Sequence, residues 1–218
     1  MAHVVVLGAG IGGMIAAYDL RGELNRQDHT VTVISDKPAF EFTPSNPWIA
    51  VGWRQRTDSS INVEKYLFRK NIRFIASKAT KIDADNNTLT LENGESVDYD
   101  YLVITTGPKL AFAEVEGAGP DAGFSQSVCT LGHAETSFRD YQRLLEEPGP
   151  VVIGAVQMAS CFGPAYEYAF ILDCDLRKRK LRHKVPITFV TSEPYIGHLG
   201  LGGVGDSKSL LESAMRNR

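Results

Sequence analysis

The feature that most constrains the fold is a glycine-rich loop that follows directly on the first apolar segment. Residues 2–7 read AHVVVL, a short β-branched run typical of a buried parallel strand. Gly8, Gly10 and Gly13 then supply the spacing G-x-G-x-x-G, and an alanine-rich stretch, MIAAYDLRGEL, follows with the composition of a helix. Strand, glycine loop and helix in this order predict the first unit of a parallel α/β sheet that binds phosphate.

Each glycine of this loop has a separate physical role. Gly8 permits the tight turn after the strand, Gly10 lets a pyrophosphate approach the main chain, and Gly13 allows the helix to pack closely on the strand. The amino terminus of the helix favours an anion, because its free N–H groups carry partial positive charge. The loop is therefore predicted to hold the pyrophosphate of a dinucleotide.

A second strand, HTVTVIS at residues 29–35, follows at the distance expected for such a unit. An acidic side chain usually ends this strand and accepts hydrogen bonds from the adenosine ribose. Here Ser35 ends the strand and Asp36 follows. We predict that the pair binds the ribose, with Asp36 favoured because a carboxylate accepts two hydroxyls. The alternative is that Asp36 only begins the turn DKP.

A later strand-to-helix turn, in GPVVIGAVQMASCFGPAYE, lacks two of the glycines that a nucleotide loop needs. Counted from Gly154, glycine is required at positions 156 and 159, but the sequence has Val156 and Ala159. Their side chains would crowd a pyrophosphate, so a nicotinamide nucleotide is not expected to bind there. Cys161 stands in the same turn, which indicates thiol chemistry in place of cofactor binding.

The remaining pattern divides the chain into two α/β domains. Alternating segments around the turns DADNN and ENGE predict a small β-meander joined to the first sheet. The segment EVEGAGPDAG marks the boundary, which gives domains at residues 1–115 and 116–218. The second domain has one strand-helix-strand unit and a final helix, so we expect an incomplete second Rossmann-like domain in the N-terminal part of a longer protein. The apolar loop FEFTPSNPWIAVGW is expected to line a cavity.

Composition narrows the function classes. A chain of 218 residues with a formal charge of −3 has no basic footprint for nucleic acid, and the run RKRKLRHK is interpreted as a solvated helix end. No signal peptide precedes the first strand, and the longest uncharged run, residues 148–166, is broken by glycines and prolines. We therefore expect a cytoplasmic protein without a transmembrane segment. Cys129, Cys161 and Cys174 form no C-x-x-C pair, so no metal site is expected.

Six segments together resemble the sulfide:quinone oxidoreductase family of flavoproteins: VVVLGAGIGGMIAAY, FTPSNPW, YDYLVITTGPKL, SVCTLGHAE, ASCFGPAYEYA and TSEPYIGHLG. The resemblance covers essentially all 218 residues. It implies an α/β fold with FAD in a Rossmann-like FAD-binding domain, and sulfide and quinone as reactants. It also implies that the FAD contacts come from Gly8, Gly10, Ile11, Gly12, Gly13, Ser35, Asp36, Ala79, Thr106 and Gly107.

The same resemblance implies that Cys161 is the thiolate beside the flavin ring and Cys129 its companion, with Glu167 and His198 handling protons. For Cys161 the sequence gives an independent argument for reactivity, because it is expected at a helix start. The positive end of a helix dipole favours the thiolate, which is the form that attacks sulfur or flavin. The alternatives are that the two cysteines are packing residues and that His198 only makes a hydrogen bond in its loop. Cys174 matches no catalytic motif and is expected to be a packing residue.

One departure from the family pattern concerns a third cysteine, which the family's reaction needs and which lies beyond the second domain. This chain ends before such a residue, and before the helices that would give peripheral contact with the cytoplasmic membrane. We therefore expect that the chain alone does not turn over sulfide and that it holds FAD weakly.

Three other functions stay open. Val156 and Ala159 disfavour an NADH:quinone dehydrogenase, and the lack of a cysteine pair after the first fold disfavours a pyridine-nucleotide disulfide reductase. The third alternative is a non-catalytic FAD-binding or partner-binding remnant, whose exposed sheet edge pairs with another chain. Such pairing includes a homo-oligomer.

Overall fold

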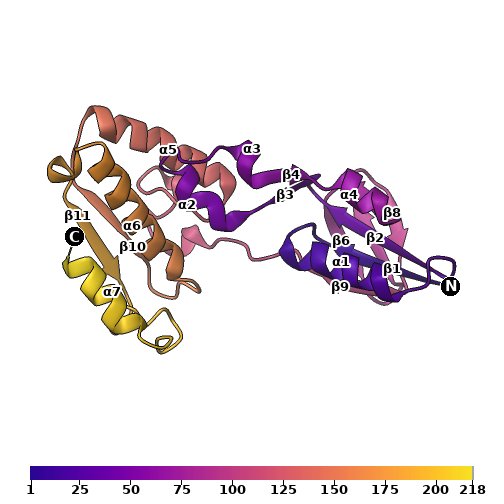
Figure 1. Cartoon of the computed structure of the whole chain (residues 1–218). Coiled ribbons are helices and arrows are strands. Elements are labelled where there is room, and N and C mark those ends of the chain that lie inside the picture. Colours follow the sequence, from indigo (N-terminus) through magenta and orange to yellow (C-terminus); the bar gives the residue numbers. More distant parts are fainter. Residues whose placement is uncertain (218) are drawn as a thin grey trace. The chain divides into compact units, whose positions relative to one another are not determined.

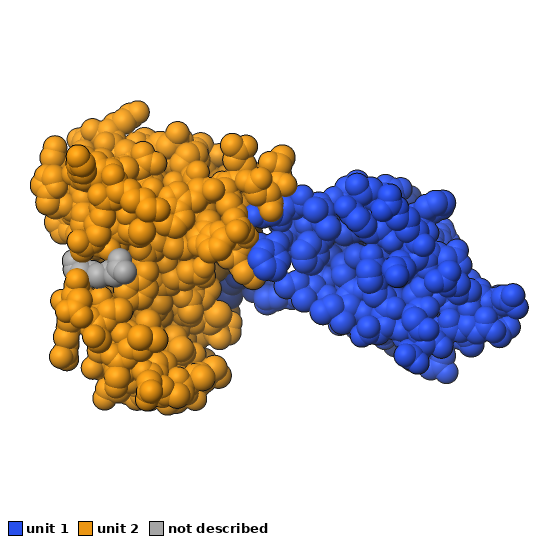
Figure 2. Space-filling view, viewed as in Figure 1, with its two compact units in different colours: residues 1–42, 59–111 blue, residues 43–58, 112–218 orange. Residues whose placement is uncertain are grey.

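The structure is a computed structural model that describes residues 1–217. The chain forms two compact units, unit 1 with residues 1–42 and 59–111, and unit 2 with residues 43–58 and 112 onward (Figure 2). The domain boundary expected at residue 115 stays a prediction. Residues 43–58, which that division places in the first domain, pack in unit 2.

Unit 1 is built on a four-stranded parallel sheet in the order β5-β2-β1-β9. Figure 1 labels β1, β2 and β9 of this sheet. Its strands are β1 (Ala2–Leu7), β2 (His29–Ser35), β5 (Arg73–Ala76) and β9 (Tyr101–Ile104). Leu7 in β1 is in register with Ile34 in β2 and with Ile104 in β9. The carboxyl ends of the strands therefore meet at one edge, where parallel α/β sheets bind ligands.

Two layers cover the faces of this sheet, because successive side chains of a strand point to opposite faces. Val6 and Val33 pack with one face layer, and Val5 and Ile34 pack with the other. The first layer consists of α1 (Ile11–Glu23) and α4 (Glu64–Arg69). The second is the predicted meander, which forms an antiparallel sheet of its own from β6 (Ala79–Asp83), β7 (Thr88–Leu91) and β8 (Ser96–Asp98).

Unit 2 contains a parallel strand pair and three long helices. They are β10 (Val151–Ala155), β11 (Ile187–Thr191), α5 (Leu131–Glu146), α6 (Gly163–Lys178) and α7 (Ser207–Arg216). Tyr141, Ile153 and Leu172 join α5, β10 and α6 in the main core. The predicted α/β, Rossmann-like fold is confirmed.

Four shorter strands and helices complete this description: β3 (Ala39–Glu41), β4 (Ser60–Asn62), α2 (Asn46–Ile49) and α3 (Arg56–Ser59).

The middle of the apolar loop that was expected to line a cavity packs in the core of unit 2. Ile49, Ala50 and Val51 are at most 3% exposed and pack in the clusters formed by α5 and α6. The indole Nε1 of Trp53 donates to a carboxylate oxygen of Asp175 on α6 at 2.7 Å. These residues therefore serve packing, and the expectation that the loop lines a cavity stays a prediction.

Candidate functional site

The glycine loop of unit 1 is a three-residue turn, residues 8–10, between β1 and α1. Gly8 has a φ of +114°, and a Cβ there would lie 2.4 Å from the carbonyl oxygen of Thr105. A Cβ on Gly13 would lie 1.9 Å from the carbonyl oxygen of Gly8. Main-chain atoms already occupy both spaces, so only glycine fits at either position.

Gly10 differs from these two glycines, because a Cβ there would meet no atom within 4 Å. Gly10 is exposed and is the N-cap residue of α1, whose first turn holds no acidic side chain. The first N–H groups of a helix have no partner within the helix, and they carry partial positive charge. A phosphate group can therefore approach the main chain at this helix start.

Thr105 holds the glycine loop from the neighbouring strand, a role that the sequence pattern did not reveal. Its N–H donates to the carbonyl oxygen of Leu7 at 2.8 Å. Its hydroxyl is within donating distance of two carbonyl oxygens, 2.9 Å from that of Leu7 and 3.2 Å from that of Gly8. Thr105 directly follows β9, so it links the carboxyl ends of two strands. The available signal was a hydroxyl residue at the strand end, next to the predicted Thr106.

The predicted ribose-binding pair ends the neighbouring strand. Ser35 is the last residue of β2, and its hydroxyl donates to the carboxylate of Asp36 at 3.4 Å. Asp36 is exposed, so its carboxylate can also accept hydrogen bonds from a ligand. The N–H of Gly8 donates to the carbonyl oxygen of Ile34 at 2.7 Å, which ties β2 to the glycine loop.

The other predicted FAD contacts divide between this edge of the sheet and the meander. Ile11 and Gly12 begin α1 and are exposed, and Thr106 and Gly107 are exposed after β9. Ala79 begins β6 instead and is half-buried against the core of the meander. Its contact with adenine therefore stays a prediction, as do the other cofactor contacts.

The second strand-to-helix connection is longer than the first. Residues 156–162, seven in number, connect β10 to α6. Gly154 lies inside β10, where a Cβ would come within 1.9 Å of the carbonyl oxygen of Val190 on β11. Gly154 therefore serves strand pairing and does not open a phosphate loop, which adds to the argument from Val156 and Ala159.

Both predicted catalytic cysteines are exposed, and each directly precedes the N-cap residue of a helix. Cys161 precedes Phe162 at the start of α6, and Cys129 precedes Thr130 at the start of α5. The Thr130 hydroxyl oxygen accepts a hydrogen bond from the N–H of His133 at 3.1 Å. Cys129 thus has a capped helix start beside it, which the sequence pattern did not reveal. The third free thiol, on α6, is half-buried.

A hydrogen-bond cluster in unit 2 holds the loop that carries His198. We call it the Glu193–Tyr166 clamp. The carboxylate of Glu193 accepts from the hydroxyl of Tyr166 at 2.6 Å and from the N–H of Leu199 at 2.5 Å. The Tyr166 hydroxyl also accepts from the N–H of Gly197 at 3.0 Å. Tyr166 is buried in α6, so the clamp fixes the His198 loop to the helix that follows Cys161.

The clamp shifts the pKa of both its members. Burial acts to raise the pKa of the Glu193 carboxyl, but hydrogen bonds from Tyr166, Thr191 and Leu199 outweigh burial and lower it. Burial, together with the bond to Glu193, raises the pKa of Tyr166 to about 12. At neutral pH the clamp is therefore a carboxylate paired with a neutral phenol.

The two residues predicted to handle protons lie near this clamp along the chain. Glu167 follows Tyr166 on α6, and desolvation raises the pKa of its carboxyl. His198 is half-buried, and its ring lies edge-on to that of Tyr195 with the centroids 5.2 Å apart. Within residues 1–217 neither side chain hydrogen-bonds to a cysteine, so their roles stay predictions.

Metal sites and membrane spans are two further classes of feature that bear on function. In residues 1–217, no group of three or more His, Cys, Asp or Glu side chains is placed to hold a metal ion. Over the same range, no helix is long and apolar enough to cross a membrane.

A short glycine turn at the carboxyl edge of a parallel sheet, with an open helix start and an acid after the next strand, defines a dinucleotide-binding protein of the Rossmann type. The model of the pyridine nucleotide-disulphide oxidoreductase family matches residues 2–174, and the chain belongs to this family. Pyridine nucleotide-disulphide oxidoreductases are FAD-dependent flavoproteins.

Comparisons with individual proteins show which members of this family the chain is most similar to among those described here. The chain is 50% identical to the sulfide-quinone reductase of Aquifex aeolicus (strain VF5) over 216 residues, which is 99% of this chain and 49% of the relative. The X-ray structure of the sulfide:quinone oxidoreductase from Aquifex aeolicus matches with a TM-score of 0.92 and 49% identity, over 100% of this chain and 49% of that one. The structure of NDH2 from Plasmodium falciparum in complex with NADH matches with a TM-score of 0.73 over 99% of this chain and 46% of that one. At 18% identity, that match shows the fold alone.

These likenesses confirm the resemblance to sulfide:quinone oxidoreductases. The chain spans about half the length of the relatives it matches.

Proposed function

We propose that this chain forms the FAD-binding part of a sulfide:quinone oxidoreductase, in which sulfide would be oxidised at a cysteine next to the flavin, with the flavin as electron acceptor and quinone as the final acceptor. The observation that carries the proposal is the pair of exposed thiols, Cys129 and Cys161, each directly before a helix N-cap. A relative that is 50% identical to this chain over 216 residues is a sulfide-quinone reductase.

The residues of unit 1 fit FAD. Gly8 and Gly13 keep the loop tight, and the open space at Gly10 leaves room for the pyrophosphate at the start of α1. Asp36, with Ser35, takes the ribose hydroxyls. When bound, FAD accepts an electron pair from the sulfur and delivers it to the quinone.

The residues of unit 2 bring the sulfur chemistry. Cys161 and Cys129 are both exposed beside a helix start, where a sulfur substrate can reach the thiol. Glu167, whose pKa is raised by desolvation, takes up a proton more readily than an ordinary carboxylate. The Glu193–Tyr166 clamp keeps His198 in place as the second proton-handling group.

The proposal includes a place for the protein at the cytoplasmic surface of a membrane, because quinones dissolve in the bilayer. Co-sedimentation with quinone-containing vesicles tests this part: the 218-residue chain should stay in the supernatant, because the resemblance assigns membrane contact to helices that this chain does not contain. Sedimentation of the chain alone would contradict that assignment and leave the flavin and thiol assignments intact.

The test reads the flavin directly, because the chain spans about half of its relatives. The full 218-residue chain is loaded with FAD and titrated with sulfide without oxygen, while the visible spectrum is recorded. We expect the flavin bands to bleach, or a charge-transfer band to appear, and we expect Cys161→Ser to abolish the response. Cys174→Ser, a matched change on α6, should respond like the unchanged chain.

A second readout concerns the thiols alone. Iodoacetamide should alkylate Cys161 and Cys129 faster than the half-buried Cys174 at neutral pH. A sulfide response that survives in Cys161→Ser, or alkylation of Cys161 no faster than that of Cys174, would contradict the proposal.

A further inference from the structure

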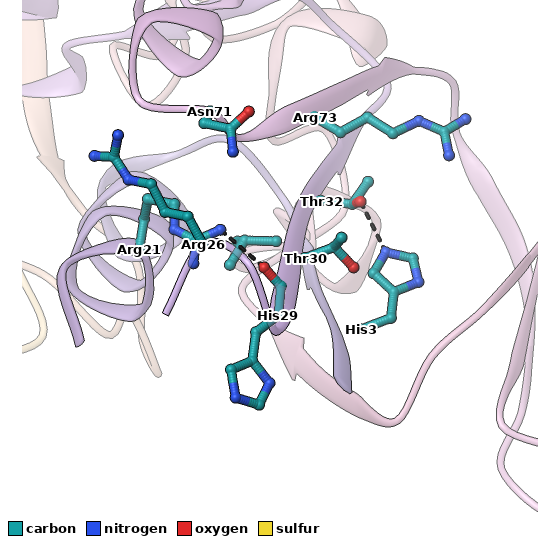
Figure 3. Close-up of a pocket in the computed structure, with 9 residues that line it drawn as sticks. His3, Arg21, Arg26, His29, Thr30, Thr32, Asn71 and Arg73 are labelled. Carbon is teal, nitrogen blue, oxygen red and sulfur yellow. Dashed lines mark hydrogen bonds between the residues drawn. The ribbon is translucent and has the colours of Figure 1, made fainter. Parts of the chain in front are cut away.

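A cavity of about 350 Å³ lies at the amino edge of the unit 1 sheet, the edge opposite the glycine loop (Figure 3). Its lining includes three arginines, two histidines and an asparagine: Arg21, Arg26, Arg73, His3, His29 and Asn71. The strand β1 spans residues 2–7, and each residue advances a strand by about 3.3 Å, so roughly 16 Å separate its ends. The cavity is therefore separate from the position proposed for the pyrophosphate.

The lining is rich in positive charge. No aspartate or glutamate is among the residues that line the cavity. Arg73 pairs with Glu95 at 3.3 Å, which offsets one of the three guanidinium charges. Arg26 is exposed at the rim, and among the described residues it has no ion-pair partner. The excess of positive charge favours an anion in this cavity.

Arg21 is the buried member of the lining, with only 4% of its surface exposed. Its Nη1 donates to the carbonyl oxygen of His29 at 3.1 Å, a bond drawn in Figure 3, and its Nη2 donates to that of Leu24 at 2.8 Å. Both acceptors are neutral, and the Nε of Arg21 is buried without a partner. The Nδ1 atom of His29 is also buried without a partner. A buried cation without a counter-charge is costly, and a bound anion would remove that cost.

We propose that this cavity binds a small free oxyanion of the phosphate or sulfate type. The planar guanidinium groups of Arg21 and Arg26 offer donors in a fork, the geometry that matches the oxygens of such an anion. The amide of Asn71 and the hydroxyl of Thr30, which also line the cavity, supply neutral donors. The anion binds the folded form and therefore stabilises unit 1.

The test is titration of inorganic phosphate into the full chain by calorimetry, with sodium chloride holding the ionic strength constant. We expect saturable binding and a phosphate-dependent rise in Tm that chloride does not give. Arg26→Glu should weaken phosphate binding about tenfold or more, because it replaces a donor by a like charge. Arg69→Glu, the matched change at an exposed arginine of α4 outside the cavity, should keep the affinity within about twofold.

Two further variants distinguish phosphate binding in this cavity from phosphate binding at the glycine loop. Gly10→Ala alters the glycine loop and should leave the phosphate binding that depends on Arg26 unchanged, whereas Arg21→Lys keeps the charge, loses the fork and should weaken that binding. If Arg21→Lys does not fold, the comparison of Arg26→Glu with Arg69→Glu still decides. Equal responses to phosphate and chloride, equal losses in those two variants, or loss in Gly10→Ala would overturn the proposal. Binding to phosphatidylglycerol vesicles without binding of inorganic phosphate would overturn it as well.

Discussion

Three residues connect β1 to α1 in unit 1, whereas seven connect β10 to α6 in unit 2. At the first turn, main-chain atoms fill the space where a Cβ of Gly8 or Gly13 would lie. At the second, Val156, Met158 and Cys161 are exposed.

The length of a strand-to-helix turn and its glycines therefore determine together whether the turn suits an anion or a thiol. A short turn keeps the helix start beside the strand end, so that the N–H groups of the first helical turn face an anion. A longer turn, such as residues 156–162, places side chains between the strand end and the helix start, and one of these side chains can be a thiol. Substitutions at both turns, and at the residues that support them, test this contrast.

Gly13→Ala should damage both the fold and the cofactor site of unit 1. The new Cβ would lie 1.9 Å from the carbonyl oxygen of Gly8, a main-chain atom that cannot move cheaply. We expect a loss of about 3 kcal/mol in the free energy of unfolding in urea, and no bound flavin. Gly22→Ala, in the same helix with no atom within 4 Å of the new Cβ, is the control and should be neutral or slightly stabilising. Stoichiometric flavin in Gly13→Ala would contradict the close packing of the loop.

Gly10→Ala should separate folding from cofactor binding. Its Cβ meets no protein atom within 4 Å, so the free energy of unfolding should change by less than about 0.5 kcal/mol. The same methyl group occupies the space predicted for the pyrophosphate. We expect the FAD affinity to fall about 100-fold, or about 2.7 kcal/mol, as measured by flavin fluorescence titration. Unchanged affinity would place the pyrophosphate elsewhere.

Thr105→Val should loosen the glycine loop without adding bulk. The carbonyl oxygen of Gly8 loses its hydroxyl donor, while Leu7 keeps the donor N–H of residue 105. The expected loss in the free energy of unfolding is about 1–2 kcal/mol, with weaker FAD binding. Thr106→Val, an exposed neighbour, serves as control and should change the stability by less than about 0.5 kcal/mol. Equal effects of both changes would argue against a role for the Thr105 hydroxyl.

Glu193→Gln should show a pH-dependent loss of stability. Hydrogen bonds lower the folded-state pKa of this carboxyl below its ordinary value of 4.5, so its contribution is complete above that value and is lost as the pH falls through the folded-state pKa. At pH 7 the unchanged chain should be more stable by about 1–2 kcal/mol, and the two should converge in acid.

Glu167→Gln is the control for Glu193→Gln, because it is expected to change the stability at neutral pH in the opposite direction. Desolvation raises the folded-state pKa of Glu167, so its ionised form is disfavoured by folding. Removing that charge should slightly stabilise the protein at neutral pH and have no effect in acid. Parallel curves for Glu193→Gln and the unchanged chain across the pH range would contradict the assignment of the clamp.

The double change Val156→Gly with Ala159→Gly should change the protein least. It restores the glycine spacing, but seven residues still separate β10 from α6, and Gly154 still lies within the strand. We expect no gain in NADH affinity by fluorescence titration. Micromolar NADH binding would show that the two side chains alone had blocked the site, and it would revive the NADH:quinone dehydrogenase alternative.

The sequence predicted most of unit 1, because its signals are local. A β-branched run, a glycine spacing and an alanine-rich stretch each act within a few residues. Thr105 escaped notice because its bonds to Leu7 and Gly8 join residues 98 and 97 positions apart. Propensity and periodicity do not report such contacts.

The apolar loop and the start of α5 show two further limits of the sequence. Apolar residues at 49–51 indicated burial, but they did not indicate which helices would cover them. Thr130 is a recognisable cap residue, yet the sequence pattern did not fix where α5 begins, so Cys129 was not placed beside a helix start. The roles of Cys129, Cys161, Glu167 and His198 rest on resemblance and stay predictions.

The packing of residues 43–58 in unit 2, between two segments of unit 1, also affects which fragments of the protein can fold and in which order its units fold. Residues 43–58 belong to unit 2, and the bond from Trp53 to Asp175 spans 122 residues. A fragment that starts after residue 115 would therefore lack part of its own interior, and it should expose apolar surface and aggregate. During synthesis on the ribosome, residues 43–58 cannot pack until more than a hundred later residues have been made. Unit 2 should therefore complete its folding after unit 1.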